Sequence, residues 1–238
     1  MIEQLLPPKA VAVEALEDPP QATLFPQERA LLAKAVEKRR LEFTTVRHCA
    51  RQALARLGVA AVPILPGERG APRWPDGIVG SMTHCVGYRA AVVARAADLT
   101  AVGVDAEPHE PLPPEVLGAI TVPQERPRLS RLVATRPGVH WDRLLFSAKE
   151  SVYKAWFPLT GRWLGFEDAS VEFAEPADGE PDGTGAFHAR LLVPGPVVAG
   201  VARTGFAGRW LVRDGLLLTA VTVTPDGHGA TEERTIVL

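Results

Sequence analysis

The chain has 238 residues, enough for one large domain or two small ones around a real hydrophobic core. Its net charge of −2 identifies no partner by itself. No apolar run reaches the roughly 18–20 residues of a membrane helix, and the first residues lack the pattern of a signal peptide. The two cysteines, Cys49 and Cys85, are isolated and have no metal-ligand spacing, so we expect a reduced, cytoplasmic protein.

The first half of the sequence predicts a strand at 10–15, followed by one long basic helix over 27–57 that Gly58 ends. A loop at 59–78 comes next, and 78–97 predicts either two strands or a strand and a helix. The basic helix has two interpretations, a solvated face or a site for an anion such as phosphate or nucleic acid.

The proline-rich segment 107–114 predicts a boundary between two halves, so we divide the chain into 1–110 and 111–238. Beyond a mixed stretch, a helix is predicted from Ala148 to Pro158. The remaining pattern predicts strands separated by glycine and proline turns, with a loop at 175–186. These strands are expected at 169–174, 187–193, 209–212 and 216–223.

Two acidic clusters carry the chemistry of the chain. A strand at 101–105 ends in Asp105 and Glu107, which would face the same side because strand residues alternate. A divalent cation would relieve the repulsion between these two carboxylates. The alternative is an ordinary exposed strand end, so the pair is weak evidence by itself.

The second cluster is the run from Ser147 to Lys154. Ser147 and Glu150 fit a helix capping box, and Glu150 with Lys154 could form a surface ion pair. Lys149 would then lie in the first helical turn, where the helix dipole disfavours a cation. An anion bound at this helix start would explain Lys149 better.

Two segments resemble signature motifs of the 4′-phosphopantetheinyl transferases: Gly-Val-Asp-Ala-Glu at 103–107, and Phe-Ser-Ala-Lys-Glu-Ser-Val-Tyr-Lys at 146–154. The similarity is to the broad-specificity, enterobactin-synthetase type, which activates siderophore, non-ribosomal peptide and polyketide synthases. It extends over most of 38–172, through further segments at 38–51, 80–88, 141–146 and 155–166.

The resemblance implies an α+β pseudo-dimer of two similar lobes, each a small antiparallel sheet with a long helix, and an active site between them. Asp105, Glu107 and Glu150 would hold Mg²⁺, or alternatively Mn²⁺. Coenzyme A would be the co-substrate. Its diphosphate would contact Lys149 and Lys154.

The 3′-phosphate and adenine end of coenzyme A would lie against the first lobe. The residues implied are Arg39, Arg47, Thr83 and His84, with Arg40 and Arg51 as weaker candidates. Some relatives carry a lysine where this chain has Pro66, so Arg69 is expected to replace it.

The implied reaction transfers the 4′-phosphopantetheine group to a serine of an apo acyl or peptidyl carrier protein and releases 3′,5′-ADP. Glu150, Asp105 and Lys154 are the expected catalytic residues, with Glu150, Asp105 or a metal-bound water as the base. We expect a monomer that binds neither nucleic acid nor membranes. The rival functions are a magnesium-dependent nucleotide hydrolase or nucleotidyl transferase, and a non-catalytic module that binds an anion such as RNA.

Overall fold

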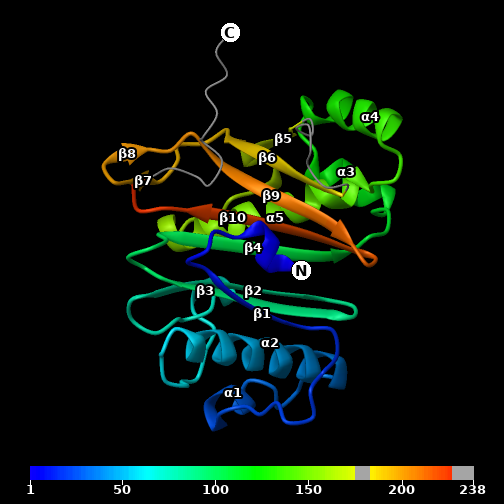
Figure 1. Cartoon of the computed structure of the whole chain (residues 1–238). Coiled ribbons are helices and arrows are strands. Elements are labelled where there is room, and N and C mark those ends of the chain that lie inside the picture. Colours follow the sequence, from blue (N-terminus) through cyan, green and yellow to red (C-terminus); the bar gives the residue numbers. More distant parts are fainter. Residues whose placement is uncertain (175–182, 227–238) are drawn as a thin grey trace.

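Two antiparallel sheets, each covered by a long helix, make up the computed structural model of the chain, which describes residues 1–174 and 183–226 (Figure 1). The loop predicted at 175–186 therefore lies mostly outside the described residues, and its last three residues belong to a strand. Within the described part of the chain, no helix is long and apolar enough to cross a membrane.

The first lobe is a three-stranded sheet in the order β1-β3-β2. Its strands are β1 (Val11–Ala15), β2 (Ile78–Cys85) and β3 (Tyr88–Arg95). Gly87 turns the β2–β3 hairpin with φ 74°, a conformation in which a residue without a Cβ carries no steric penalty. The strand predicted at 10–15 is thus confirmed, and 78–97 forms two strands rather than a strand and a helix.

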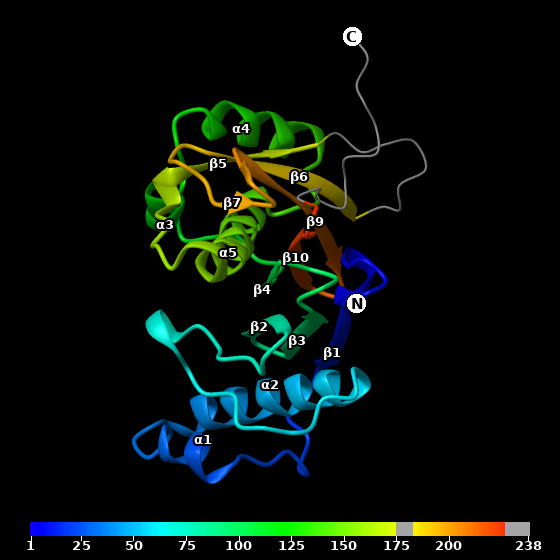
Figure 2. The ribbon, with the colours of Figure 1, turned by 90° about the vertical axis from the view of Figure 1, so that its left-hand side faces the viewer.

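The single helix predicted over 27–57 is wrong, because the chain breaks it into two. Helix α1 (Pro26–Ala30) gives way to turns before α2 (Glu37–Arg56) begins, with Val36 extended at its N-cap. The apolar spacing was misleading, since Leu32 is buried whereas Leu31 and Val36 face solvent. Helix α2 covers β1 and β3, and α1 lies on its outer side, away from the second lobe (Figure 2).

The second lobe is a five-stranded sheet in the order β4-β10-β9-β6-β5. Its strands are β4 (Ala101–Pro108), β5 (Ala169–Phe173), β6 (Thr184–Leu191), β9 (Gly205–Arg213) and β10 (Leu216–Val223). The other elements are α3 (Pro114–Ile120), α4 (Glu125–Thr135), α5 (Trp141–Thr160), the short pair β7 (Val197–Val198) and β8 (Val201–Ala202), and the 3-10 turns η1 (Ile2–Leu5), η2 (Glu68–Gly70) and η3 (Phe166–Asp168).

The helix predicted to start at Ala148 instead begins at Trp141, so the capping-box interpretation is wrong. The indole of Trp141 packs in the core against Trp210, with ring centroids 5.4 Å apart, and thereby extends the apolar face of α5 by two turns. The Ser147 hydroxyl lies in mid-helix and hydrogen-bonds Thr219 at 3.0 Å. Helix α5 ends just after Pro158, at the left-handed Gly161.

Gly103 lets α5 lie directly on β4. A Cβ at this position would come within 2.0 Å of the Ser151 carbonyl oxygen, so any larger residue would push the helix off the strand. The Asp105 side of β4 therefore faces α5 at close range.

The lobes meet where β2 lies beside β4, without a backbone ladder between them. The Ser81 hydroxyl accepts the Val104 N–H at 3.1 Å, and the Thr83 hydroxyl accepts the Ala106 N–H at 3.0 Å. Because β4 pairs with β10, the change of sheet falls between residues 95 and 101, ahead of the division predicted after residue 110. The predicted α+β pseudo-dimer is confirmed, and each lobe has one 20-residue helix on its sheet.

Candidate active site

A cavity of about 270 Å³ lies between the lobes, and both predicted halves of the site line it. Helix α2 contributes Arg39, Phe43 and Arg47, β2 contributes His84, and α5 contributes Glu150 and Lys154. A larger hollow of about 930 Å³ lies between α4 and the edge of the second sheet, but none of the predicted site residues lines it. The chemistry therefore favours the smaller cavity.

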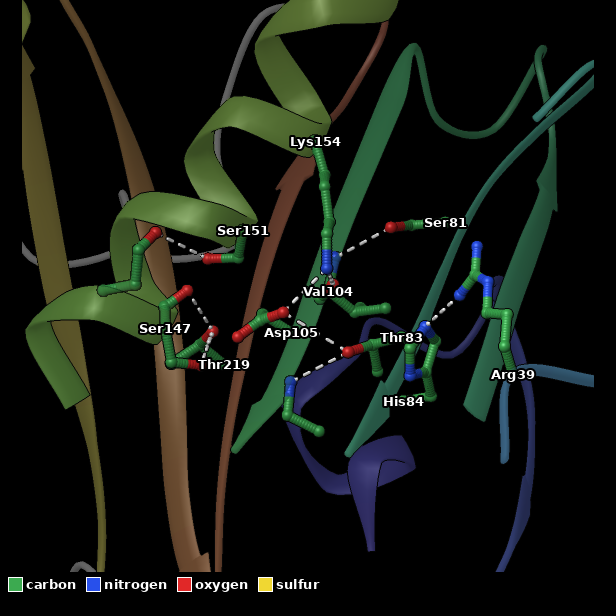
Figure 3. Close-up of polar contacts among 12 residues, drawn as sticks. Arg39, Ser81, Thr83, His84, Val104, Asp105, Ser147, Ser151, Lys154 and Thr219 are labelled. Atoms are coloured by element: carbon green, nitrogen blue, oxygen red, sulfur yellow. Dashed lines mark hydrogen bonds and ion pairs between the residues drawn. The ribbon is translucent and has the colours of Figure 1, made fainter. Parts of the chain in front are cut away.

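Asp105 does not itself line the cavity: it is buried beside Lys154, which does, and it is held by both lobes (Figure 3). Its Oδ1 accepts a hydrogen bond from Lys154 Nζ at 2.7 Å and one from the Thr83 hydroxyl at 3.3 Å. Its Oδ2 is buried and has no hydrogen-bond partner in the described structure. Since buried polar atoms are nearly always satisfied, this oxygen is an acceptor that a ligand could use.

Lys154 reaches across from α5 and holds the middle of β4. Besides Asp105, its ammonium donates to the Val104 carbonyl oxygen at 3.1 Å. The surface ion pair expected between Glu150 and Lys154 is not formed. Glu150 instead has no hydrogen bond or ion pair within the described residues, and burial raises the pKa of its carboxyl while the Lys154 charge opposes that rise.

Glu107 is held by α5 of its own lobe and does not line the cavity. Its Oε2 accepts a hydrogen bond from Arg143 Nη1 at 3.0 Å, and Arg143 also donates to the carbonyl oxygens of Glu110 and Pro111. Burial first, and then the charge of Asp105, raise the pKa of Glu107 to about 7, while Arg143 opposes the shift. The described residues contain no group of three His, Cys, Asp or Glu side chains placed to hold a metal ion.

Lys149 does not lie at a helix start and does not project into the cavity between the lobes. Its ammonium is buried and donates to the Ile120 carbonyl at 2.7 Å, the Phe166 carbonyl at 2.7 Å and Glu125 Oε2 at 3.0 Å. Burial lowers the pKa of Lys149, and Glu125 opposes that effect. An ammonium has three protons, so no donor is left over for a phosphate. The explanation by an anion at the helix N-terminus is therefore wrong.

The opposite wall of the cavity is basic. Arg47 stacks on the Phe43 ring, with its guanidinium carbon 3.1 Å from the ring centroid, and its Nε donates to the Ile64 carbonyl at 2.9 Å. Its two terminal nitrogens make no hydrogen bond to the described residues. Burial lowers the pKa of Arg47 to about 10, and Glu28 opposes the shift. A buried cation with free donors is suited to an anionic ligand.

His84 and Arg39 join this wall from two elements (Figure 3). Arg39 Nη1 lies 3.1 Å from His84 Nε2, and His84 Nδ1 lies 3.5 Å from a Glu42 carboxylate oxygen. Burial lowers the pKa of His84, against the effect of Glu42. Thr83, predicted as a cofactor contact, is instead buried under Asp105 and does not line the cavity.

Of the remaining basic candidates, only one lines the cavity. Arg51 is engaged by Glu28 at 3.0 Å and by the Thr23 carbonyl, whereas Arg40 is exposed and does not line the cavity. Arg69 does line it, in a left-handed conformation with φ 50°, and its guanidinium lies 5.5 Å from the Trp163 ring. Arg69 can therefore reach a ligand in the cavity, and its replacement of the family lysine stays a prediction.

Three charged residues that bind predicted site residues were not anticipated: Glu28, Glu125 and Arg143. Each acts as a partner of a predicted residue from a distant part of the chain, and no local pattern links the two. Cys85 was set aside in the sequence, and the structure agrees. Burial and the carboxylates of Glu107 and Asp105 raise the pKa of its thiol to about 12, so it stays protonated and is a poor nucleophile.

Comparison with known families and proteins gives a consistent result. The model of the 4′-phosphopantetheinyl transferase N-terminal domain matches residues 27–94, and that of the 4′-phosphopantetheinyl transferase superfamily matches 101–193. The two matches divide where the sheets change. The 4′-phosphopantetheinyl transferase Svp of Streptomyces mobaraensis is 56% identical over 235 residues, covering 98% of this chain and 93% of Svp.

Two further relatives extend the similarity. The 4′-phosphopantetheinyl transferase PptT of Mycobacterium tuberculosis is 53% identical over 210 residues, covering 88% of this chain and 90% of PptT. Enterobactin synthase component D of Salmonella typhimurium is 32% identical over 204 residues, covering 84% of this chain and 80% of the relative.

An α+β pseudo-dimer with Glu150 and Lys154 facing Arg39, Arg47 and His84 across an interlobe cavity has the features of a site for an anionic ligand. The chain belongs to the 4′-phosphopantetheinyl transferase family, and it is a transferase.

Proposed function

We propose that this enzyme takes the 4′-phosphopantetheine group from coenzyme A, attaches it to a serine of an apo acyl or peptidyl carrier protein, and releases 3′,5′-ADP. The observation that carries the proposal is the opposition of two walls across one cavity. Glu150 and Lys154 line it from the second lobe, with Asp105 held by Lys154, and Arg47 and His84 line it from the first. A ligand with phosphates at two separate places suits this arrangement.

The basic wall is proposed to bind the 3′-phosphate. Arg47 offers two terminal nitrogens that make no hydrogen bond to the described residues, and Arg39 with His84 lies on the same side of the cavity. Bidentate contacts from guanidinium groups are well matched to phosphate oxygens. Arg69 is proposed as a further phosphate contact. Lys149 is left out of this set because its three protons are already used.

Asp105 and Glu150 fit a divalent cation, since one presents a buried oxygen without a partner and the other makes no competing interaction in the described structure. Hard oxygen donors of this kind favour Mg²⁺, with Mn²⁺ as an alternative. Glu107 would complete the set by giving up its contact with Arg143. The bound cation would neutralise charge on the diphosphate.

Lys154 is proposed to neutralise the departing phosphate while it holds Asp105 in place. The serine oxygen forms a bond to phosphorus, the bond from phosphorus to 3′,5′-ADP breaks, and a carboxylate takes the serine proton. Glu150 suits this role better than Asp105, because burial raises the pKa of Glu150 and Lys154 already engages Asp105.

Carrier proteins of siderophore, peptide or polyketide synthases are the proposed acceptors, a choice supported by the relatives named enterobactin synthase component D. Both walls of the cavity come from one chain, which supports a monomer. Cys49 and Cys85 are free thiols, which supports a cytoplasmic location. We propose no nucleic-acid or membrane partner.

The test incubates the protein with coenzyme A, Mg²⁺ and several apo carrier proteins, and then reads the intact mass of each carrier. A gain equal to one phosphopantetheine group, dependent on the carrier serine, supports the transferase. Consumption of coenzyme A or a nucleotide without any gain in carrier mass would favour the hydrolase or nucleotidyl transferase and refute the proposal.

A further inference from the structure

Glu28 is fully buried on α1, yet it is the charged hub of the first lobe. Its carboxylate accepts the Phe25 N–H at 2.9 Å, the Ile64 N–H at 2.8 Å and two contacts from Arg51 Nη1 at 3.0 and 3.1 Å. Arg47 Nε lies 3.7 Å from the same group. One carboxylate therefore ties together α1, α2 and the loop after α2.

Two of the restraints on Arg47 depend on Glu28. The ion pair at 3.7 Å is direct. The second is indirect, because Arg47 Nε donates to the carbonyl of Ile64, and the N–H of Ile64 is held by Glu28. Glu28 itself does not line the cavity, and α1 lies behind α2 as seen from the second lobe (Figure 2). Among the described residues that Glu28 contacts through its carboxylate, only Arg47 lines the cavity, so Arg47 is the route by which Glu28 would influence a ligand.

The charges on α2 explain why a carboxylate is needed there. Arg39, Arg47 and Arg51 recur at multiples of four residues, which places them on one side of the helix around Phe43. Their mutual repulsion and the burial of Arg47 both disfavour a guanidinium at that place. Glu28 offsets this repulsion from the side opposite the cavity, so the free nitrogens of Arg47 stay available to a ligand.

We propose that Glu28 is a positioning residue that selects coenzyme A by its 3′-phosphate, acting through Arg47. The inference rests on the proposed function, because it assumes that Arg47 contacts that phosphate. It predicts an effect confined to ligands that carry the 3′-phosphate, whereas a purely structural role would weaken all ligands alike.

The test measures dissociation constants by calorimetry for coenzyme A and for 3′-dephospho-coenzyme A, using the full-length protein. The wild type should prefer coenzyme A, and Arg47→Ala should lose most of that preference. Glu28→Gln should reduce the preference about tenfold, the scale of a disturbed charged hydrogen bond, with little change for the dephospho ligand. In the Arg47→Ala background, adding Glu28→Gln should change the preference less than about twofold.

Glu125→Gln is the matched control, because Glu125 is equally buried but lies in the second lobe. It should leave the preference at its wild-type value even if it lowers stability. Should Glu28→Gln fail to fold, Glu28→Asp decides, since it keeps the charge one methylene short and should still reduce the preference.

The two levels of the proposal fail in different ways. A wild-type protein that binds both ligands equally contradicts the 3′-phosphate site and this inference with it. If wild type and Arg47→Ala behave as expected but the Glu28 variants keep the wild-type preference, or lose affinity for both ligands alike, only the positioning role is overturned.

Discussion

Lys149 and Lys154 belong to one short motif on one helix, but they serve different regions of the molecule. Lys154 is partly exposed at the interlobe cavity, where it holds Asp105. Lys149 is buried in the second lobe, where Glu125 and two backbone carbonyls use all its protons. Lys154 thus places its charge at the cavity, whereas Lys149 places its charge in the core of the second lobe.

Helix geometry explains the difference. At 3.6 residues per turn, positions five apart differ by about 140° around the axis, whereas Glu150 and Lys154, four apart, share one side. A motif that is compact in sequence can therefore supply a catalytic face and a packing face together. The role of each residue in such a motif therefore depends on which side of the helix it lies on.

The largest expected effect is on stability. Lys149→Met would leave the Glu125 carboxylate buried without its cation, and we expect it to lower the free energy of unfolding by about 3–5 kcal/mol. Urea unfolding followed by circular dichroism measures this loss. Lys154→Met should lose less, because the Lys154 side chain is partly exposed and lines the cavity, and the Thr83 hydroxyl still donates to Asp105.

A double variant provides the control for that prediction. Glu125→Leu with Lys149→Met removes both charges, so it should recover most of the lost stability and bind coenzyme A like the wild type. If the stable double variant bound coenzyme A much more weakly while 3′,5′-ADP bound normally, Lys149 would be a diphosphate ligand and the comparison would be wrong.

The next effect is on turnover. Lys154→Met should lower the rate at saturating coenzyme A by about 10²–10³-fold, since it removes a charge that neutralises the departing phosphate. Initial rates of 3′,5′-ADP release measure it. Turnover within a few-fold of the wild type, in a protein that melts normally, would show that Lys154 only holds β4.

The smallest expected effect is on the pH dependence of stability, through His84 in the basic wall of the cavity. Burial lowers the pKa of His84, helped by Arg39, Lys154 and Arg89 and opposed by Glu42. The unfolded chain therefore binds this proton more readily, so His84 costs stability as the pH falls through its unfolded value near about 6.5. His84→Gln should show a smaller drop in melting temperature than the wild type between about pH 7.5 and pH 5.5. An unchanged drop would mean that His84 stays hydrated in the folded protein.

The sequence was informative where local pattern and motif agreed. The hairpin strands and the cavity positions of Arg39, Arg47, His84 and Lys154 follow from it. The strand that carries Asp105 was also predicted, although β4 continues to Pro108 instead of ending at Asp105. The errors concern the bounds of the two long helices, because the spacing of apolar residues does not show whether the rest of the protein buries them. Leu31 and Val36 look helical but face solvent, and they hid the break before α2.

The partners of charged residues could not be predicted. Glu28 meets Ile64 across 36 positions, and Lys149 meets Glu125 across 24. Such pairings depend on how distant segments pack, so the sequence does not predict that Lys149 is buried. The position of Lys149 in the middle of α5, rather than at its start, follows only from the structure.

The most direct test of the interlobe site is the rate of carrier modification by Asp105→Ala, read as intact carrier mass with coenzyme A and Mg²⁺. Asp105 joins β4, Lys154 and Thr83, so its loss should abolish the mass gain while circular dichroism shows an intact fold. Wild-type modification by a folded Asp105→Ala variant would contradict the assignment of this cavity as the active site.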